Sequence, residues 1–131
     1  MKTIMDQIWW MGEYRRLLVW QKAHAMAVKV TGVAKSISGG ANAALRNQMI
    51  RAAMSVPANI VEGRAQESEK EFVRFLNYAF ASAGELDYHL LIALDTGAIS
   101  EKDYRDSARA AEEVRKMLRG LIKKLRLPAT G

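Results

Sequence analysis

Few residues in this sequence could carry metal chemistry. Glu85 and His89 lie four positions apart, so on a helix they would share one face and could reach a single metal ion. His24 is the only other histidine, and the Glu-x-x-His pairs that di-metal carboxylate bundles use do not occur. The sequence has no cysteine, which excludes a disulfide framework and a thiolate zinc site. We therefore expect no metal and no cofactor.

Nucleophilic catalysis is not indicated either. It would need a serine or threonine beside a base or in a strained turn, and no residue in the sequence is marked in that way. No glycine-rich loop follows a strand, so the sequence lacks the phosphate cradle of nucleotide-binding proteins. We expect a protein that is not an enzyme.

The clearest chemical signal is the uneven distribution of charge. The net charge is +6, yet residues 67–98 contain six acidic residues against two basic ones. Residues 115–126 contain six basic residues and no acid. This asymmetry indicates a surface that faces a polyanion or a partner of opposite charge. The alternative, given equal weight, is a solvated helix end whose cations suit the helix dipole.

Several cations are spaced so that they would share a helix face. Lys22 and Lys29 lie seven positions apart, and Arg115, Arg119 and Lys123 follow one another at intervals of four. Such cations contact phosphates without reading base sequence, and no aromatic ladder for base stacking accompanies them. The candidate nucleic-acid-binding residues are Lys22, Lys29, Arg46, Arg51, Arg64, Arg115, Lys116, Arg119, Lys123 and Lys124.

The elements that position these cations are predicted to be helices, because apolar residues recur at intervals of three and four. A first stripe runs from Val19 to Ile37 and stops at a Ser-Gly-Gly sequence. A second stripe runs from Leu45 to Ile60 and ends near Gly63. Both stripes predict an amphipathic helix.

Two further helices follow. Ser68 to Glu71 form a capping box, which opens a third stripe that runs from Phe72 to Ala93 and closes at Thr96-Gly97. Ser100 with Asp103 caps the fourth helix, which stops at Leu127-Pro128. Its expected core residues are Tyr104, Ala108, Ala111, Leu118, Leu121 and Leu125.

The second helical stretch contains the unusual residues Pro57, Asn59 and Glu62. A proline inside a helix costs roughly 3 kcal/mol. The helix could continue with a kink, the Ser55 hydroxyl helping to satisfy the freed backbone groups. It could instead break at Val56, with Pro57 as the first residue of a new short helix. Asn59 and Glu62 would lie either on the solvated side or at an interface with another helix or subunit.

Four helices with short connections predict an all-α, antiparallel up-down-up-down four-helix bundle over residues 17–127. Residues 1–16 form an N-terminal extension whose Trp9 and Trp10 would extend the first helix or dock on a neighbouring surface, and residues 128–131 form a C-terminal tail. No apolar run approaches the ~20 residues that span a bilayer, so we expect a soluble, cytoplasmic protein. Several helices are apolar on more than one face, which favours self-association, the alternative being a large monomer core.

Three segments resemble the four-helix-bundle family of 23S ribosomal RNA intervening-sequence proteins. They are VWQKAH at 19–24, IRAAMSVPANIVEGRAQES at 50–68 and EFVRFLNYAFASAGELDYHL at 71–90. The ordered match covers about residues 17–100. Proline and asparagine inside a helical pattern make the match specific. By this resemblance, the residues that shape the bundle or its subunit contacts are Trp20, Gln21, His24, Pro57, Asn59, Glu62, Gly63 and Glu85.

The resemblance also implies partners. A relative of the family, the accessory variability determinant of diversity-generating retroelements, is a basic pentameric barrel that binds nucleic acid and a reverse transcriptase. The implied partners are thus further copies of the chain in a homopentamer, RNA or DNA, and a nucleic-acid-processing protein such as a reverse transcriptase, with no membrane involved. Independently of the resemblance, we expect His24 to be a hydrogen-bonded structural residue and Trp20 to pack.

The sequence departs from the family pattern at three places. SISGGANAA replaces the usual Phe-Pro and Glu between the first two helices, Ile50 stands where the first arginine of an Arg-Arg pair is usual, and Phe80-Ala81-Ser82 replaces Arg-Gly-Ser. Two cations common in the family are missing, which weakens the case for nucleic-acid binding at those positions.

The leading hypothesis is a non-enzymatic, oligomeric four-helix bundle that binds nucleic acid through basic surface. The rival is a protein-interaction scaffold that uses an apolar ring and the acidic third helix. A small enzyme would need a pocket with converging polar groups, of which the sequence gives no sign.

Overall fold

The computed structural model describes residues 13–126 and contains four α-helices in that range. They are α2 (Leu18–Lys35), α3 (Ala43–Arg64), α4 (Glu69–Asp95) and α5 (Glu101–Arg126). Two short 3-10 helices, η1 (Glu13–Arg16) and η2 (Gly40–Asn42), precede α2 and α3. No strand occurs between residues 13 and 126. The predicted all-α class and the four predicted helices are confirmed, whereas Trp9, Trp10 and residues 127–131 lie outside the described residues.

Local polar groups set the ends of the helices. The Ser68 hydroxyl accepts a hydrogen bond from the Glu71 amide at 3.1 Å, and the Ser100 hydroxyl accepts one from the Asp103 amide at 3.0 Å. Each serine satisfies one of the amides that the first turn of a helix leaves without a partner. Gly97, with φ of 74°, turns the chain after α4. The predicted helix starts at Ser68 and Ser100 are therefore confirmed.

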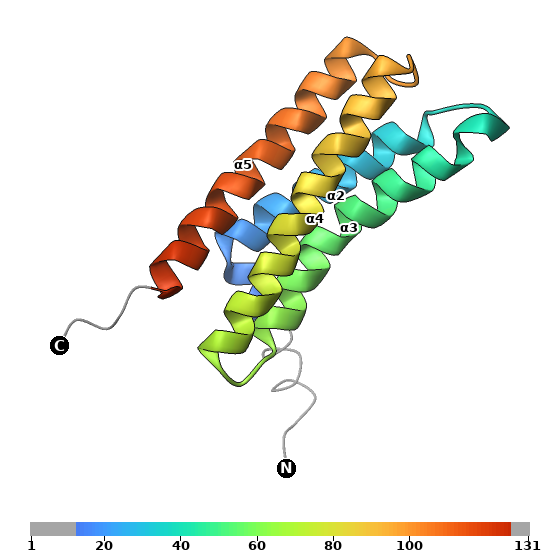
Figure 1. Ribbon diagram of the computed structural model, residues 1–131. Helices are drawn as coiled ribbons and strands as arrows, with labels where there is room; N and C mark the ends of the chain where they lie inside the picture. The colour runs from blue at the N-terminus through green and yellow to red at the C-terminus, as the bar shows by residue number, and fades with distance from the viewer. Residues whose placement is uncertain (1–12, 127–131) are drawn as a thin grey trace.

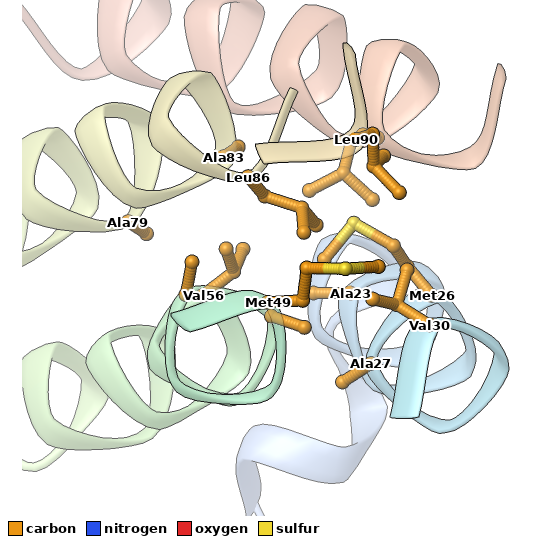
Figure 2. Close-up of a cluster of buried hydrophobic side chains, with 14 of the residues drawn as sticks. Ala23, Met26, Ala27, Val30, Met49, Val56, Ala79, Ala83, Leu86 and Leu90 are labelled. Carbon is orange, nitrogen blue, oxygen red and sulfur yellow. The ribbon is translucent and has the colours of Figure 1, made fainter. Parts of the chain in front are cut away.

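The four helices enclose one core. α2 packs against α3 and α5, α3 packs against α4, and α4 packs against α5, so that the contacts close a ring of four helices (Figure 1). Figure 2 shows Met26 and Val30 of α2 meeting Met49 of α3 and Leu86 of α4 in the centre. All four side chains are completely or almost completely buried. Burial of a side chain of this size contributes about 1.5–3 kcal/mol, so this centre stabilises the bundle.

The buried face of α5 differs from the prediction. Tyr104, Ala108, Leu121 and Leu125 are only half-buried. The residues of α5 that are buried are Ser107, Ala111, Val114, Leu118 and Ile122. Ala111 and Leu118 are thus buried as predicted, and Tyr104, Leu121 and Leu125 pack against the core while partly buried. The polar Ser107 hides the start of the buried stripe in the sequence.

α3 is continuous through Pro57, which is buried in its interior. The alternative of a new helix starting at Pro57 is therefore wrong. The Ser55 hydroxyl lies 2.7 Å from the Ser82 hydroxyl of α4, so it links two helices. The Asn59 side-chain amide donates to the Ser55 carbonyl at 2.8 Å. The polar residues of this segment thus hold α3 together locally and join it to α4.

The connection between α2 and α3 is held by an arginine. The Arg46 guanidinium donates hydrogen bonds to the carbonyls of Ile37 and Gly39, at 3.1 and 2.8 Å. Gly39 takes a φ of 95°, a conformation that favours glycine.

Within residues 13–126, no helix is long and apolar enough to cross a bilayer.

Candidate functional site

The last three turns of α5 form a basic surface. Lys116, Arg119, Lys123 and Lys124 are all exposed, and no acidic residue lies between positions 115 and 126. We call these four residues the α5 basic face. The helix dipole favours the cations of the last turn, Lys123 and Lys124, whereas Arg119 and Lys123 lie four positions apart and repel each other.

An aromatic side chain on α4 supports two arginines of this region. The guanidinium carbons of Arg115 and Arg119 lie over the Phe80 ring, 5.3 and 5.5 Å from its centroid. Arg115 also donates to Glu112 at 3.3 Å, and its side chain is only 28 % exposed. Such cation–π contacts contribute about 0.5–1 kcal/mol at exposed sites and fix the position of the guanidinium. Arg119, which makes no ion pair within residues 13–126, is held in place while remaining exposed.

A groove between α4 and α5 adjoins the α5 basic face. One hollow of about 390 Å³ is lined by residues of both helices, and a second hollow of about 580 Å³ adjoins it, since Asn77 and Arg126 line both. We call the first hollow the α4–α5 groove, and its lining residues are Asn77, Phe80, Arg119, Ile122, Lys123 and Arg126. Three of the six are cations, and none is acidic.

The remaining basic candidates are scattered over α2 and α3. Lys22 forms an ion pair with Glu113 of α5 at 3.2 Å, and Lys29 is exposed on the same helix. Arg51 donates to Gln48 and lies 3.8 Å from Glu85.

The other two basic candidates lie on α3. Arg64 lies over the Phe72 ring, with its guanidinium carbon 6.0 Å from the ring centroid. Arg46 donates hydrogen bonds to the α2–α3 connection, which favours a structural role over the predicted contact with nucleic acid. The candidates on α5 lie together on one exposed segment of that helix.

The expected structural residues at the start of α2 form an aromatic cluster. Trp20 stacks on His24 with centroids 4.9 Å apart, and Tyr14 meets Trp20 edge-on at 5.0 Å. The Gln21 side chain donates to the Arg15 carbonyl at 2.8 Å and so ties η1 to α2. Trp20 packs against the core as predicted. His24 is exposed and interacts by ring stacking, so the predicted hydrogen-bonded role is replaced by stacking.

Gly63 shows why the proline-containing segment ends in glycine. A Cβ atom at this position would lie 2.7 Å from the Phe75 Cβ and 3.0 Å from a ring carbon of Phe72. Only glycine therefore permits this approach of α3 and α4. Glu62, by contrast, is exposed, which fits either a solvated position or a contact with another subunit.

A third hollow, also of about 580 Å³, lies between α2 and α3. Trp20, His24 and Pro57 line it together with two exposed apolar residues, Val28 and Met54, which are 61 % and 56 % exposed. We call it the α2–α3 groove. Exposed apolar residues that line a common hollow indicate a surface for another protein chain.

Glu85 and His89 do meet, with Oε1 of Glu85 3.2 Å from Nε2 of His89. Over residues 13–126, however, no three or more potential metal-ligating side chains gather. Among the described residues the pair has no third protein ligand, and Glu85 also faces Arg51 of α3.

Comparison with known proteins identifies the family. The model of the 23S rRNA-intervening sequence protein family matches residues 15–120, which is most of the chain. The chain belongs to this family. A crystal structure of a protein of unknown function from the S23 ribosomal protein family of Bacteroides thetaiotaomicron is similar, with a TM-score of 0.76 and 27 % sequence identity. The similarity covers 81 % of this chain and 99 % of that one. None of the curated proteins compared matches the sequence.

Three residues of this 23S rRNA-intervening sequence protein were missed by the reasoning from sequence. Asn77, Phe80 and Arg126 line the α4–α5 groove. Asn77 directly follows the buried Leu76, and Phe80 directly follows the buried Ala79. Both residues therefore lie at the edge of the buried stripe of α4. That position is the only signal in the sequence that they could border a neighbouring helix.

Proposed function

We propose that this protein is a non-enzymatic binder of nucleic acid, RNA or DNA, that contacts the phosphate backbone through the α5 basic face. The observation that carries the proposal is the exposure of Lys116, Arg119, Lys123 and Lys124 on one helix segment that contains no acid. Lysine and arginine bind phosphates in this way without reading sequence, and they release counterions as they do so.

We further propose that the chain, with its helices antiparallel, assembles into a homopentamer in the cytoplasm. The resemblance to the pentameric retroelement accessory protein supports the subunit number, and the exposed apolar residues of the α2–α3 groove support self-association. A ring would repeat the α5 basic face in every subunit and strengthen its field. A nucleic-acid-processing protein such as a reverse transcriptase is the proposed partner. Sedimentation at micromolar concentration tests the assembly, and a monomer would contradict it.

Binding to structured RNA and to duplex DNA over a salt series tests the nucleic-acid proposal. The variant Arg119→Glu with Lys123→Glu should weaken binding and lower the slope of log K against log salt by about 1.4–1.8, since each phosphate contact contributes about 0.7–0.9. The matched control is Arg105→Glu with Arg109→Glu, which makes the same charge change at the same spacing earlier on α5, where both residues are exposed. No binding at low salt, or equal effects of the two variants, would refute the proposal.

The α2–α3 groove favours a second candidate function, a protein-interaction scaffold without direct nucleic-acid binding. Met54 and Val28 are its exposed apolar residues. A partner protein retained after nuclease treatment of a lysate, and lost with Met54→Glu, would support the scaffold. Loss of all partners on nuclease treatment would support nucleic-acid binding instead.

A further inference from the structure

The α4–α5 groove differs from the α5 basic face because it has an apolar floor. Ile122 is 8 % exposed and Phe80 is half-buried, while Arg119, Lys123 and Arg126 supply positive charge around them. Its volume of about 390 Å³ lies within the range of about 300–1,000 Å³ that ligand sites occupy. An apolar surface surrounded by cations suits a ligand that is flat and apolar in one part and anionic in another.

The arrangement of Arg119 provides a flat surface for stacking. Its guanidinium carbon lies 5.5 Å from the centroid of the Phe80 ring, and Arg115 lies over the same ring at 5.3 Å. Unpaired bases stack on guanidinium planes as well as on aromatic rings. A base in the groove would therefore meet a guanidinium group that Phe80 already holds in position, at a smaller entropic cost than on a freely moving arginine.

Asn77 supplies hydrogen-bonding groups at the point where the two hollows join. Its side-chain amide donates to the Val73 carbonyl at 3.0 Å, which fixes the side chain. The carbonyl oxygen of the same side chain is left to accept a hydrogen bond. The Watson–Crick edge of an unpaired base carries suitable donors, whereas in a duplex that edge is already bonded to the complementary base.

The neighbouring hollow extends the groove along α4. Glu69 and Glu71 are among its lining residues, but Glu71 is paired with Arg74 at 2.8 Å. Leu125 and Val73 continue the apolar floor, and Arg126 borders both hollows. A chain of nucleotides, rather than one compact ligand, matches two adjoining hollows that share a cation.

We propose that the α4–α5 groove binds single-stranded nucleic acid, with a base stacked on the Arg119 guanidinium that Phe80 supports and phosphates on Lys123 and Arg126. This inference rests on the proposed function and gives it a direction, a preference for unpaired strands over duplex. A duplex would engage the exposed cations alone, because its bases are already stacked and paired.

Fluorescence anisotropy with a labelled single strand of about twelve nucleotides, and with the same strand annealed to its complement, tests the preference at equal salt. The wild-type protein should bind the single strand at least about tenfold more tightly. Phe80→Leu keeps an apolar side chain but removes the support for Arg119, so it should weaken single-strand binding about fivefold or more, in line with the loss of one base stack. Its duplex affinity should stay within about twofold of wild type.

Two variants make this test specific. Asn77→Ala should lower single-strand affinity and leave the fold intact. It therefore tests the groove even if Phe80→Leu disturbs the packing of the helices. Tyr88→Leu, the same kind of substitution at a 59 % exposed position on α4, should leave the ratio of the two affinities unchanged. Equal binding of single strand and duplex, or equal losses for both ligands in Phe80→Leu and Asn77→Ala, would overturn the groove assignment and leave backbone binding standing. The absence of any binding at low salt would refute both.

Discussion

Gly63 lies in close contact with α4, and replacing it with alanine tests the packing of the bundle. The added Cβ would lie 2.7 Å from the Phe75 Cβ and 3.3 Å from the Phe72 carbonyl oxygen. Neither atom can move by side-chain rotation, because one is attached directly to the backbone of α4 and the other belongs to it. The contact can be relieved only by a shift of one helix relative to the other.

Two opposing contributions set the size of the effect. Extra atoms in a packed core cost about 1–3 kcal/mol, whereas alanine gains up to about 1 kcal/mol over glycine inside a helix. Gly63 lies in the last turn of α3, where the gain in helix propensity is smaller. We therefore expect Gly63→Ala to lower the free energy of unfolding by about 1–2 kcal/mol.

Urea unfolding followed by circular dichroism measures this change, at several protein concentrations because assembly would add concentration-dependent stability. Gly120→Ala is the matched control, since a Cβ at the exposed Gly120 of α5 meets no atom within 4 Å. It should raise stability by about 0.4–1 kcal/mol. Stabilisation of similar size by both substitutions would refute the close contact at Gly63.

Three other predictions concern single side chains. Pro57→Ala should stabilise the protein by about 1 kcal/mol in thermal unfolding. Restoring helix propensity gains about 3 kcal/mol, and losing two buried methylenes costs about 1.6 kcal/mol. A loss of stability would show that the proline ring is needed for packing. Arg46→Met should lower the free energy of unfolding in urea by about 1–3 kcal/mol, because two hydrogen bonds are lost. Its nucleic-acid affinity should stay within twofold of wild type. A selective loss of binding would contradict the structural role of Arg46. The Lys102 ammonium lies 3.0 Å from Asp106 and lowers the pKa of that carboxyl. The pair therefore stabilises the fold at pH values above the ordinary aspartate pKa. This stabilisation is lost as the pH falls through the lowered pKa. An NMR titration should show the pKa of Asp106 rising toward the ordinary value in Lys102→Met, and an unchanged pKa would rule out the pairing.

The helices could be predicted from sequence because their signals are local. The hydroxyl of Ser68 caps a helix whose first residues follow it directly, and the apolar stripe of α4 repeats without interruption from Leu76 to Ala93. α5 was predicted less well, because its buried stripe begins with Ser107. A polar residue in a buried position follows from tertiary packing and not from periodicity.

The site could be predicted only in part. The basic character of α5 follows from composition, but the α4–α5 groove requires Phe80 and Asn77 to face Arg119 and Arg126, which lie about forty or more residues further along the chain. Arg46 was grouped with the binding cations because its charge is visible in the sequence. The two carbonyls that engage it become neighbours only once the α2–α3 connection has folded.

The order of charges along α5 bears on how the protein folds. Glu101 and Asp103 lie in its first turn, and Lys123, Lys124 and Arg126 lie in its last, so both ends oppose the partial charges of the helix backbone. Glu112 and Arg115 add a pair between adjacent turns. A synthetic peptide with the sequence 101–126 should thus retain measurable helicity in water, decreasing as salt is added. In the full-length chain, the same segment can provide an early template on which the other three helices dock.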